Sequence, residues 1–215
     1  MFKKDRHKTL QVMAWGTYDR SKPRVRILLR ALEKDGLALT TCHVDVWNSV
    51  ADKSQIRGLV TRLHFLLRWI CAYPSLIWRF VRSPKPDVMF VGYLGQLDVL
   101  ILWPFAKIRG VPVVWDAFIS LYNTIVEDRR LISPKNPLAR LLHFLEWMAT
   151  RSADCILLDT QAHADYFADQ FRVPADKTAT VFVGAETEIF FNRRTPPSSK
   201  TPFTVLFYGQ FIPLR

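Results

Sequence analysis

Residues 153–190, ADCILLDTQAHADYFADQFRVPADKTATVFVGAETEIF, decide the fold of this chain. Cys155 to Leu158 is a short apolar run, which is typical of a strand buried on both faces. Thr160 follows, and its hydroxyl can accept an unpaired backbone N–H in the first turn of a helix. Aromatic side chains then recur at helical spacing, at Tyr166, Phe167 and Phe171. A second strand is expected from Thr178 to Val183, so the stretch predicts one right-handed βαβ unit.

The end of this unit resembles the retaining glycosyltransferases of family 4. The resemblance is carried by Ala153-Asp154 before a strand, Lys177 in a turn, and Gly184-Ala185-Glu186 followed by Phe190. In that family the stretch closes the N-terminal, acceptor-binding half of a two-domain GT-B enzyme. The resemblance implies an α/β fold with a Rossmann-like, doubly wound parallel sheet. A βαβ unit alone would indicate only an α/β domain.

The charge of the chain indicates an acidic partner. The chain has 215 residues and a net charge of +11, and 49% of its residues are apolar. This length and composition fit one substantial globular core rather than a disordered chain. Phospholipid head groups, a sugar pyrophosphate or nucleic acid would match the charge. No nucleic-acid-binding module is recognisable, so no nucleic acid is expected as a partner.

The cysteines and histidines predict neither a disulfide framework nor a metal site. Cys42, Cys71 and Cys155 are odd in number and far apart, which fits a reducing compartment. The five histidines lack metal-ligand spacing, and no metal or cofactor is expected. The polar N-terminus does not resemble a signal peptide, and no run is apolar enough to span a membrane. We therefore expect a cytoplasmic protein.

Glycine turns after predicted strands are the candidate acceptor-binding positions. The strand Leu10–Trp15 runs into a glycine turn and then into a helix that Ser21 can cap. Unpaired N–H groups at such a helix start favour a bound anion, although an ordinary tight turn fits the single glycine equally well. The third predicted strand, Asp87–Val91, ends in a second glycine turn. The resemblance implies acceptor contacts at Gly16, Thr17, Gly92 and Tyr93.

Asp116 is the candidate catalytic residue and a further acceptor contact. It closes the predicted strand Val111–Trp115, and ligands of open parallel sheets bind beyond the carboxyl ends of the strands. In many members of the family a histidine lies two residues after an aspartate here, whereas this chain has Phe118. Asp116 is therefore the available polar group. A carboxylate that caps a nearby helix fits the same position equally well.

The segment Ile56–Arg82 is crowded with leucines and aromatic residues and contains no acidic residue. Pro74 is expected to divide it into two helices. Cations interleaved with tryptophans suit an anionic membrane surface, where aromatic rings lie at head-group level. The alternative is that the apolar positions face the sheet while the arginines are solvated. The predicted membrane contacts are Arg57, Arg62, Arg68, Trp69, Trp78, Arg79 and Arg82.

Two segments between the fourth and fifth predicted strands have contrasting patterns. Ile119 to Ser133 is expected to be an exposed loop. Asn136 and Pro137 then start a predicted helix. Apolar residues at helical spacing place one face of this helix in the core, at Leu138, Leu141, Leu142, Leu145 and Met148.

The composition of the chain changes after Phe191. Residues 192–202 are rich in proline and serine, which predicts a linker after an N-terminal domain of residues 1–191. Residues 203–215 resemble the start of the family's second, nucleotide-sugar-binding domain, with a strand and a glycine turn. An isolated apolar strand seeks a partner, which predicts a possible tail-mediated homodimer. The resemblance implies donor contacts at Gly184, Glu186, Gly209 and Arg215.

The resemblance implies half of an enzyme that moves a sugar from a nucleotide-sugar donor to a saccharide or lipid-linked saccharide, with retention. The chain is expected to be inactive alone. Its basic, aromatic-rich segment predicts a peripheral position on an anionic membrane surface, at the inner face of the cell membrane. The alternative is a non-catalytic Rossmann-like module that binds a membrane or a partner protein.

Overall fold

Six parallel strands form one sheet among the residues that the computed structural model describes, which are 9–47, 59–191 and 205. For residues 59–66 only the backbone is described. The strand order is β2-β1-β3-β4-β5-β6. The strands are β1 Gln11–Gly16, β2 Ala38–His43, β3 Val88–Val91, β4 Val113–Phe118, β5 Cys155–Leu158 and β6 Thr178–Thr180.

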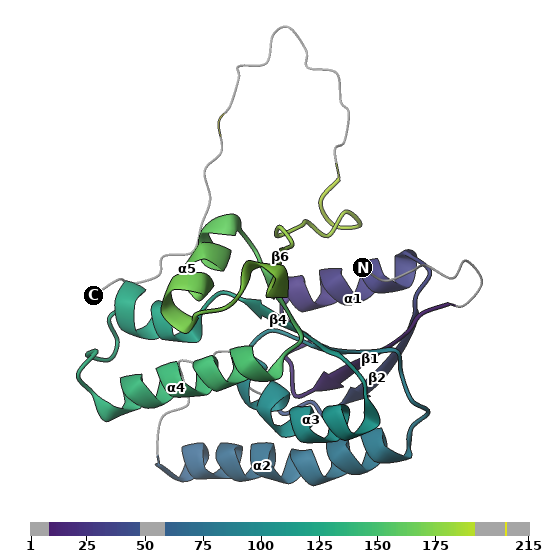
Figure 1. The fold of residues 1–215 in the computed structure, drawn as a ribbon, viewed down its shortest axis with the longest axis horizontal. Coiled ribbons are helices and arrows are strands. Elements are labelled where there is room, and N and C mark those ends of the chain that lie inside the picture. The colour runs from purple at the N-terminus through teal and green to yellow at the C-terminus, as the bar shows by residue number, and fades with distance from the viewer. Residues whose placement is uncertain (1–8, 48–58, 192–204, 206–215) are drawn as a thin grey trace, which may run out of the picture.

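Helices cover both faces of this sheet (Figure 1). α1, Pro23–Lys34, packs on one face, where Val25 joins a cluster with Val12 and Ala14. The other face carries α2 Leu59–Arg82, α3 Gln96–Arg109, α4 Pro137–Ser152 and α5 Gln161–Phe171. Right-handed crossovers explain this split, because the chain steps one way from β1 to β2 and the other way from β3 to β6. The predicted Rossmann-like, doubly wound α/β fold is confirmed.

The βαβ unit that the sequence predicts is present as β5, α5 and β6. Thr160 caps α5, since its Oγ1 accepts the backbone N–H of His163 at 3.4 Å. The last strand is shorter than predicted and ends at Thr180 rather than Val183. β5 has already ended at Leu158, so the following chain has no strand opposite it with which to pair.

α2 is one helix that continues through Pro74, so the predicted division into two helices is wrong. Ala72 and Tyr73 before the proline, and Leu76 and Phe80 after it, are all buried in the same core. Packing of both halves on the sheet therefore outweighs the backbone hydrogen bond that a proline removes from a helix interior.

α4 faces the core mainly with small side chains, which corrects the predicted leucine face in part, since Leu142, Leu145 and Met148 are half-buried. Leu138 and Leu141 are 47% and 49% exposed, whereas Ala139 and Ala149 are buried. The small residues let α4 approach α3 closely, and the larger leucines then lie at the rim of the contact or outside it.

The predicted exposed loop between β4 and α4 is partly helical. Asn123–Asp128 forms a π-helical turn. Val126 in this turn is buried at 1% exposure, so part of the segment packs against the domain.

Candidate functional site

The loops after the strands meet at one edge of the sheet, called here the carboxyl edge. The direction in which strands are added to the sheet reverses between β1 and β3. The chain first places β2 on one side of β1 and then crosses over to place β3 on the other side. Ligands of doubly wound sheets bind at this switch point, beyond the carboxyl ends of the strands. The loops that form the edge are residues 17–22 after β1, 92–95 after β3, 119–122 after β4 and 159–160 after β5.

Gly16 lies directly against the buried carboxylate of Asp98, from the first turn of α3. Asp98 Oδ2 accepts the backbone N–H of Thr17 at 2.7 Å, and Oδ1 accepts the Thr17 hydroxyl at 3.0 Å. The Tyr73 hydroxyl also donates to Oδ1, at 2.9 Å. Burial raises the pKa of Asp98 to about 6, although these donors oppose the shift. The glycine turn therefore binds a carboxylate of the protein itself.

Thr17 is 3% exposed, and its remaining polar atoms also bond within the protein. Its hydroxyl oxygen accepts the indole N–H of Trp69 at 2.8 Å, and its carbonyl accepts that of Trp47 at 2.6 Å. Thr17 thus joins β1 to α2 and to the chain after β2. The acceptor contact expected of it stays a prediction.

Gly92 gives the ring of Tyr18 room to pack over β3. A Cβ atom at this glycine would lie 3.0 Å from Tyr18 Cβ. The ring of Tyr18 also packs against that of His43, with the centroids 4.3 Å apart and the planes tilted by 36°, and the Tyr18 carbonyl lies 2.8 Å from His43 Nε2. Tyr93 is half-buried and meets the Phe118 ring edge-on at 5.1 Å. Burial raises the pKa of Tyr93, so its hydroxyl stays protonated at neutral pH.

Asp116 forms a buried ion pair with Arg24 of α1. Arg24 Nε lies 2.9 and 3.0 Å from the two carboxylate oxygens, and Nη2 lies 2.7 Å from Oδ1. Arg24 also donates to the Val181 carbonyl at 2.9 Å and lies over the Phe118 ring at 4.6 Å. Burial raises the pKa of Asp116, and the guanidinium of Arg24 opposes this shift. Asp116 therefore fixes α1 and the end of β6 to β4, and a ligand could take its oxygens only by breaking this pair.

Backbone strain lies in two neighbouring loops of the carboxyl edge. Phe118 at the end of β4 has a φ of 64°, and the N–H of Ile119 bonds back to the Ala117 carbonyl at 2.8 Å. This is a γ-turn, a conformation that is strained for a residue with a side chain. Leu94 after β3 also has a φ of 64°. Strain of this kind concentrates at binding sites, where the surrounding structure holds it in place.

An aspartate–histidine pair that the sequence analysis missed lies beside Asp116. Asp159 follows β5, and its Oδ1 is in close hydrogen-bond contact with Nδ1 of His163, in the first turn of α5. The Thr160 hydroxyl donates to the same oxygen at 3.1 Å. The side chains of Asp159 and His163 are 15% and 32% exposed. In the sequence, the available signal for this pair was the i, i+4 spacing of Asp159 and His163 across the start of α5.

Glu186 and Gly184 lie against α1, on the chain that follows β6. Glu186 accepts two hydrogen bonds from Arg26, at 2.9 and 2.8 Å, and these hold its pKa below the usual range. Arg30 of α1 lies 3.7 Å from the same carboxylate. A Cβ atom at Gly184 would lie 3.5 Å from Ile27. The donor contacts expected of Gly184 and Glu186 stay predictions.

Glu146 of α4 holds the loop after β4 and was also missed. It is 1% exposed and accepts the Ser120 hydroxyl at 2.7 Å and the N–H groups of Leu121 and Tyr122 at 2.9 and 3.0 Å. Gln96 at the start of α3 donates to it at 3.3 Å. A glutamate within a leucine-rich helix gives no sequence signal for such a role.

Several predicted residues lie outside the described part of the chain. These are Gly209, Arg215 and Arg57, together with the side chain of Arg62. The linker of 192–202 and the proposed homodimer tail of 203–215 fall there too, apart from residue 205. Of the other membrane contacts, Trp78 and Arg82 are exposed, while Arg68 and Arg79 donate to carbonyls of Asp45 and His43 at 2.9 and 3.0 Å.

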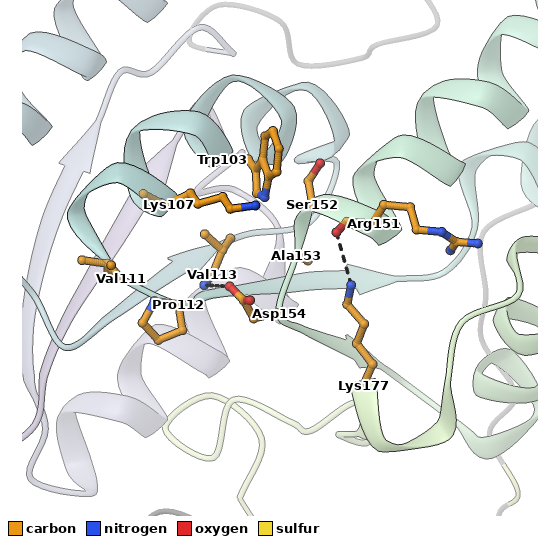
Figure 2. A pocket seen from close by; sticks show the side chains of 12 residues that line it. Trp103, Lys107, Val111, Pro112, Val113, Arg151, Ser152, Ala153, Asp154 and Lys177 are labelled. Atoms are coloured by element: carbon orange, nitrogen blue, oxygen red, sulfur yellow. Dashed lines mark hydrogen bonds between the residues drawn. The ribbon is translucent and has the colours of Figure 1, made fainter.

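Two cavities lie at the opposite edge, where the strands begin. The larger, of about 470 Å³, lies where α3 and α4 end, and is lined by Trp103, Lys107, Asp154 and Lys177 among others (Figure 2). Asp154 accepts the N–H of Val113 at 2.8 Å. Burial lowers the pKa of Lys177. Cations near helix C-termini are stabilised by the helix dipole, which accounts for this basic lining. The second cavity, of about 390 Å³, lies beside the starts of β1 and β3.

Neither a metal-ligand cluster nor a membrane-spanning helix is present in the described ranges. No group of three or more histidine, cysteine, aspartate or glutamate side chains is placed to hold a metal ion there. Within the same ranges, no helix has the length and hydropathy needed to cross a membrane.

Comparison with known proteins places most of the chain in one family. Residues 14–184 match the glycosyl transferase 4-like domain. No curated protein matches the chain. Among solved structures, the chain is similar to the crystal structure of Anabaena Alr3699/HepE in complex with UDP and glucose, with 11% identity and a TM-score of 0.42. The match covers 84% of this chain and 46% of that one, so the chain spans less than half the length of that protein.

Proposed function

The chain belongs to the glycosyl transferase 4-like domain family, and on this basis we propose that it forms the acceptor-binding half of a two-domain GT-B glycosyltransferase. The proposed reaction moves a sugar from a nucleotide-sugar donor to a saccharide or lipid-linked saccharide, with retention. The C–O bond to the donor diphosphate breaks, and the diphosphate leaves with the electron pair. The acceptor oxygen forms the new bond to the anomeric carbon of the sugar, and its proton passes to the departing diphosphate.

The Asp159–His163 pair is the observation that carries acceptor binding. The Asp159 carboxylate can only accept, so Nδ1 of His163 carries the proton of this hydrogen bond, and in the neutral form of the ring the lone pair is on Nε2. Nε2 makes no hydrogen bond to the residues that the structure describes. We therefore assign His163 to an acceptor hydroxyl, which Nε2 would orient, and Asp159 to positioning the ring.

Phe118 supports this assignment from the neighbouring strand. Many members of the family carry a histidine at this place after β4, and this chain does not. The N–H of Asp159 bonds to the Phe118 carbonyl at 3.3 Å, so the end of β5 lies directly beside it. The imidazole of His163, from α5, would thus lie at the same carboxyl edge of the sheet as the histidine after β4 in those family members.

Asp116 has a positioning role in this proposal. Its carboxylate is fully buried and engaged on both oxygens by Arg24, so it orients Arg24 rather than touching the acceptor. The pair holds Phe118, α1 and the chain after β6 in one arrangement. In this proposal Asp116 does not act on the acceptor directly. It supports the loop that lies beside His163.

The donor pocket is proposed to lie mainly in a second domain. Neither of the two cavities described above lies at the carboxyl edge. A pocket for a nucleotide sugar buries most of its ligand, and we assign most of that enclosure to the second domain. The chain by itself is therefore proposed to be inactive.

The test is sugar transfer from a panel of labelled nucleotide sugars to a membrane lipid extract. It uses this chain alone and the longest reading frame that contains it. Transfer by the longer protein, an about tenfold fall of kcat/KM in His163→Ala, and no transfer by the chain alone support the proposal. If no donor is used by either protein, the non-catalytic module is favoured, since a binding module would keep its partners without transferring sugar.

A further inference from the structure

Large apolar side chains are exposed on the outer sides of α2, α3 and α4, three of the four described helices that cover one face of the sheet (Figure 1). We call this the outer-layer surface and define it by Ile70, Trp78, Trp103, Ile108, Phe144 and Trp147. Their exposed fractions run from 38% to 84%. Core-facing helices normally expose polar residues on this side, so the surface needs a partner that shields apolar groups.

The charges on the same helices have one sign. α2 contains no acidic residue, and the acidic residues of α3 and α4 are Asp98 and Glu146, each 1% exposed. Exposed cations lie on all three helices, at Arg68, Arg79, Arg82, Lys107, Arg140 and Arg151. By contrast, the other two helices carry exposed acidic side chains, Glu33 on α1 and Asp165 and Asp169 on α5. Among the residues that the structure describes, the basic excess is therefore concentrated on this layer.

Each of the three helices repeats one tryptophan–cation pair in its C-terminal part. Arg82 lies over the Trp78 ring at 3.8 Å, Lys107 over Trp103 at 5.0 Å, and Arg151 over Trp147 at 5.0 Å. In every pair the cation follows the tryptophan by four residues, one helical turn. Lys107 and Trp103 can be followed in Figure 2, at the rim of the larger cavity.

Helix dipoles explain part of this pattern but not all of it. A cation in the last turn of a helix is stabilised by the free carbonyls there. This accounts for the lysine and arginines, but it does not call for an exposed tryptophan beside each one. It also does not explain the absence of exposed acidic groups along all three helices.

We propose that the outer-layer surface binds an anionic phospholipid bilayer, with the three tryptophan–cation pairs at head-group level. Tryptophan favours the interface between head groups and acyl chains, and cations beside it meet lipid phosphates. The surface is wider than the Ile56–Arg82 segment, because α3 and α4 contribute equally. This extends the membrane position predicted from the sequence and does not depend on sugar transfer.

The experiment is cosedimentation of the full 215-residue chain with phosphatidylcholine vesicles, with and without phosphatidylglycerol. We expect binding to the anionic vesicles that falls with rising salt and is much weaker on neutral vesicles. Arg82→Gln with Lys107→Gln should lower the partition coefficient about 25-fold, at about fivefold for each cation. The matched control, Lys22→Gln with Lys34→Gln, removes the same charge beside α1 and should change it less than about twofold.

Insertion of the rings is tested separately with brominated phospholipids, which quench tryptophan on contact. Parent protein should be quenched on anionic vesicles, and the variant Trp78→Ser, Trp103→Ser, Trp147→Ser should lose both the quenching and most of the binding. Circular dichroism and thermal melting establish that the variants fold.

Four results would overturn the proposal. They are equal loss of binding in the two charge variants, unchanged quenching in the tryptophan variant, equal binding to neutral vesicles, and a stable dimer in light scattering that the tryptophan variant breaks. The last would identify a second copy of the chain as the occupant. Vesicle binding without sugar transfer would leave this proposal standing and count only against the proposed reaction.

Discussion

At the scale of single residues, Asp98 takes the backbone N–H that the turn after β1 would otherwise offer to an anion. The glycine there is required by geometry. Gly16 has a φ of 124°, and a Cβ atom on it would lie 2.2 Å from Asp98 Oδ2. The two residues therefore depend on each other, and both can be tested by single substitutions.

We expect Gly16→Ala to lower the free energy of unfolding by about 2–4 kcal/mol, from backbone strain and overpacking together. Gly36→Ala is the matched control, because Gly36 also has a positive φ, 80°, but has nothing within 4 Å of the added methyl. It should cost only about 1–2 kcal/mol, the strain alone. Urea denaturation measures both, and equal losses would show that Asp98 does not confine the turn.

Asp98 should also make stability depend on pH. Its pKa is raised to about 6 from an ordinary value near 4, so the folded state binds a proton more tightly than the unfolded chain. The stabilisation of the folded state that comes from this pKa shift is complete below about pH 4 and is lost as the pH rises through about 6. Relative to Asp98→Asn, the parent's free energy of unfolding should fall by about 3 kcal/mol between these limits. Parallel urea curves at every pH would contradict the shift.

His163 carries the proposed acceptor contact, so His163→Ala should lower kcat/KM for transfer about tenfold, the worth of one lost hydrogen bond. Asp159→Asn should lower it less, because it removes the carboxylate that positions the imidazole but keeps the imidazole itself. Asp165→Asn, also on α5 and exposed, is the control and should leave kcat/KM unchanged. Steady-state transfer assays of the longer protein decide between these outcomes.

At the scale of elements, α2 and α4 depart from what their sequences indicate, for the same reason. Each is placed by the side chains that fit against neighbouring helices and the sheet, and not by its overall hydrophobic pattern. α2 keeps its path through Pro74 because buried residues flank the proline on both sides. α4 turns Ala139 and Ala149 inward, which leaves Leu138 and Leu141 partly in solvent.

This orientation predicts unequal costs for two leucine truncations. Leu76→Ala in α2 should lower the free energy of unfolding by about 2–5 kcal/mol, because Leu76 is fully buried. Leu141→Ala in α4 should cost less than about 1 kcal/mol, since half of its side chain already contacts water. Thermal and urea unfolding of both variants provide the measurement. A loss at Leu141 as large as at Leu76 would place the leucine face of α4 in the core.

At the scale of the whole molecule, the two ends of the sheet have different properties. The carboxyl edge gathers Asp159, His163 and the strained loops, whereas the amino edge holds the cavities and the ends of the helices that carry the tryptophan–cation pairs. A protein arranged in this way can bind a surface through its helices without covering the carboxyl edge.

The positions of the two cavities, away from the carboxyl edge, lead to a prediction for ligand binding. We expect the 215-residue chain to bind nucleotide sugars no more tightly than about 1 mM, because the described cavities lie elsewhere. Isothermal titration calorimetry with a panel of nucleotide sugars measures this. Micromolar affinity for any of them would show that the chain forms a donor pocket without a second domain.

The sequence by itself determined the parallel α/β fold, the cap at Thr160 and the family. These follow from local patterns: short apolar runs, helix starts and turn residues recur in chain order and need no knowledge of distant contacts. Only the tertiary structure decided the roles of Arg24, Asp98, Glu146 and the Asp159–His163 pair. Three of these roles join residues far apart in the chain, as when Arg24 meets Asp116 across 92 positions. The outward face of α4 was likewise decided by packing, because one apolar pattern fits a core and a membrane surface equally well.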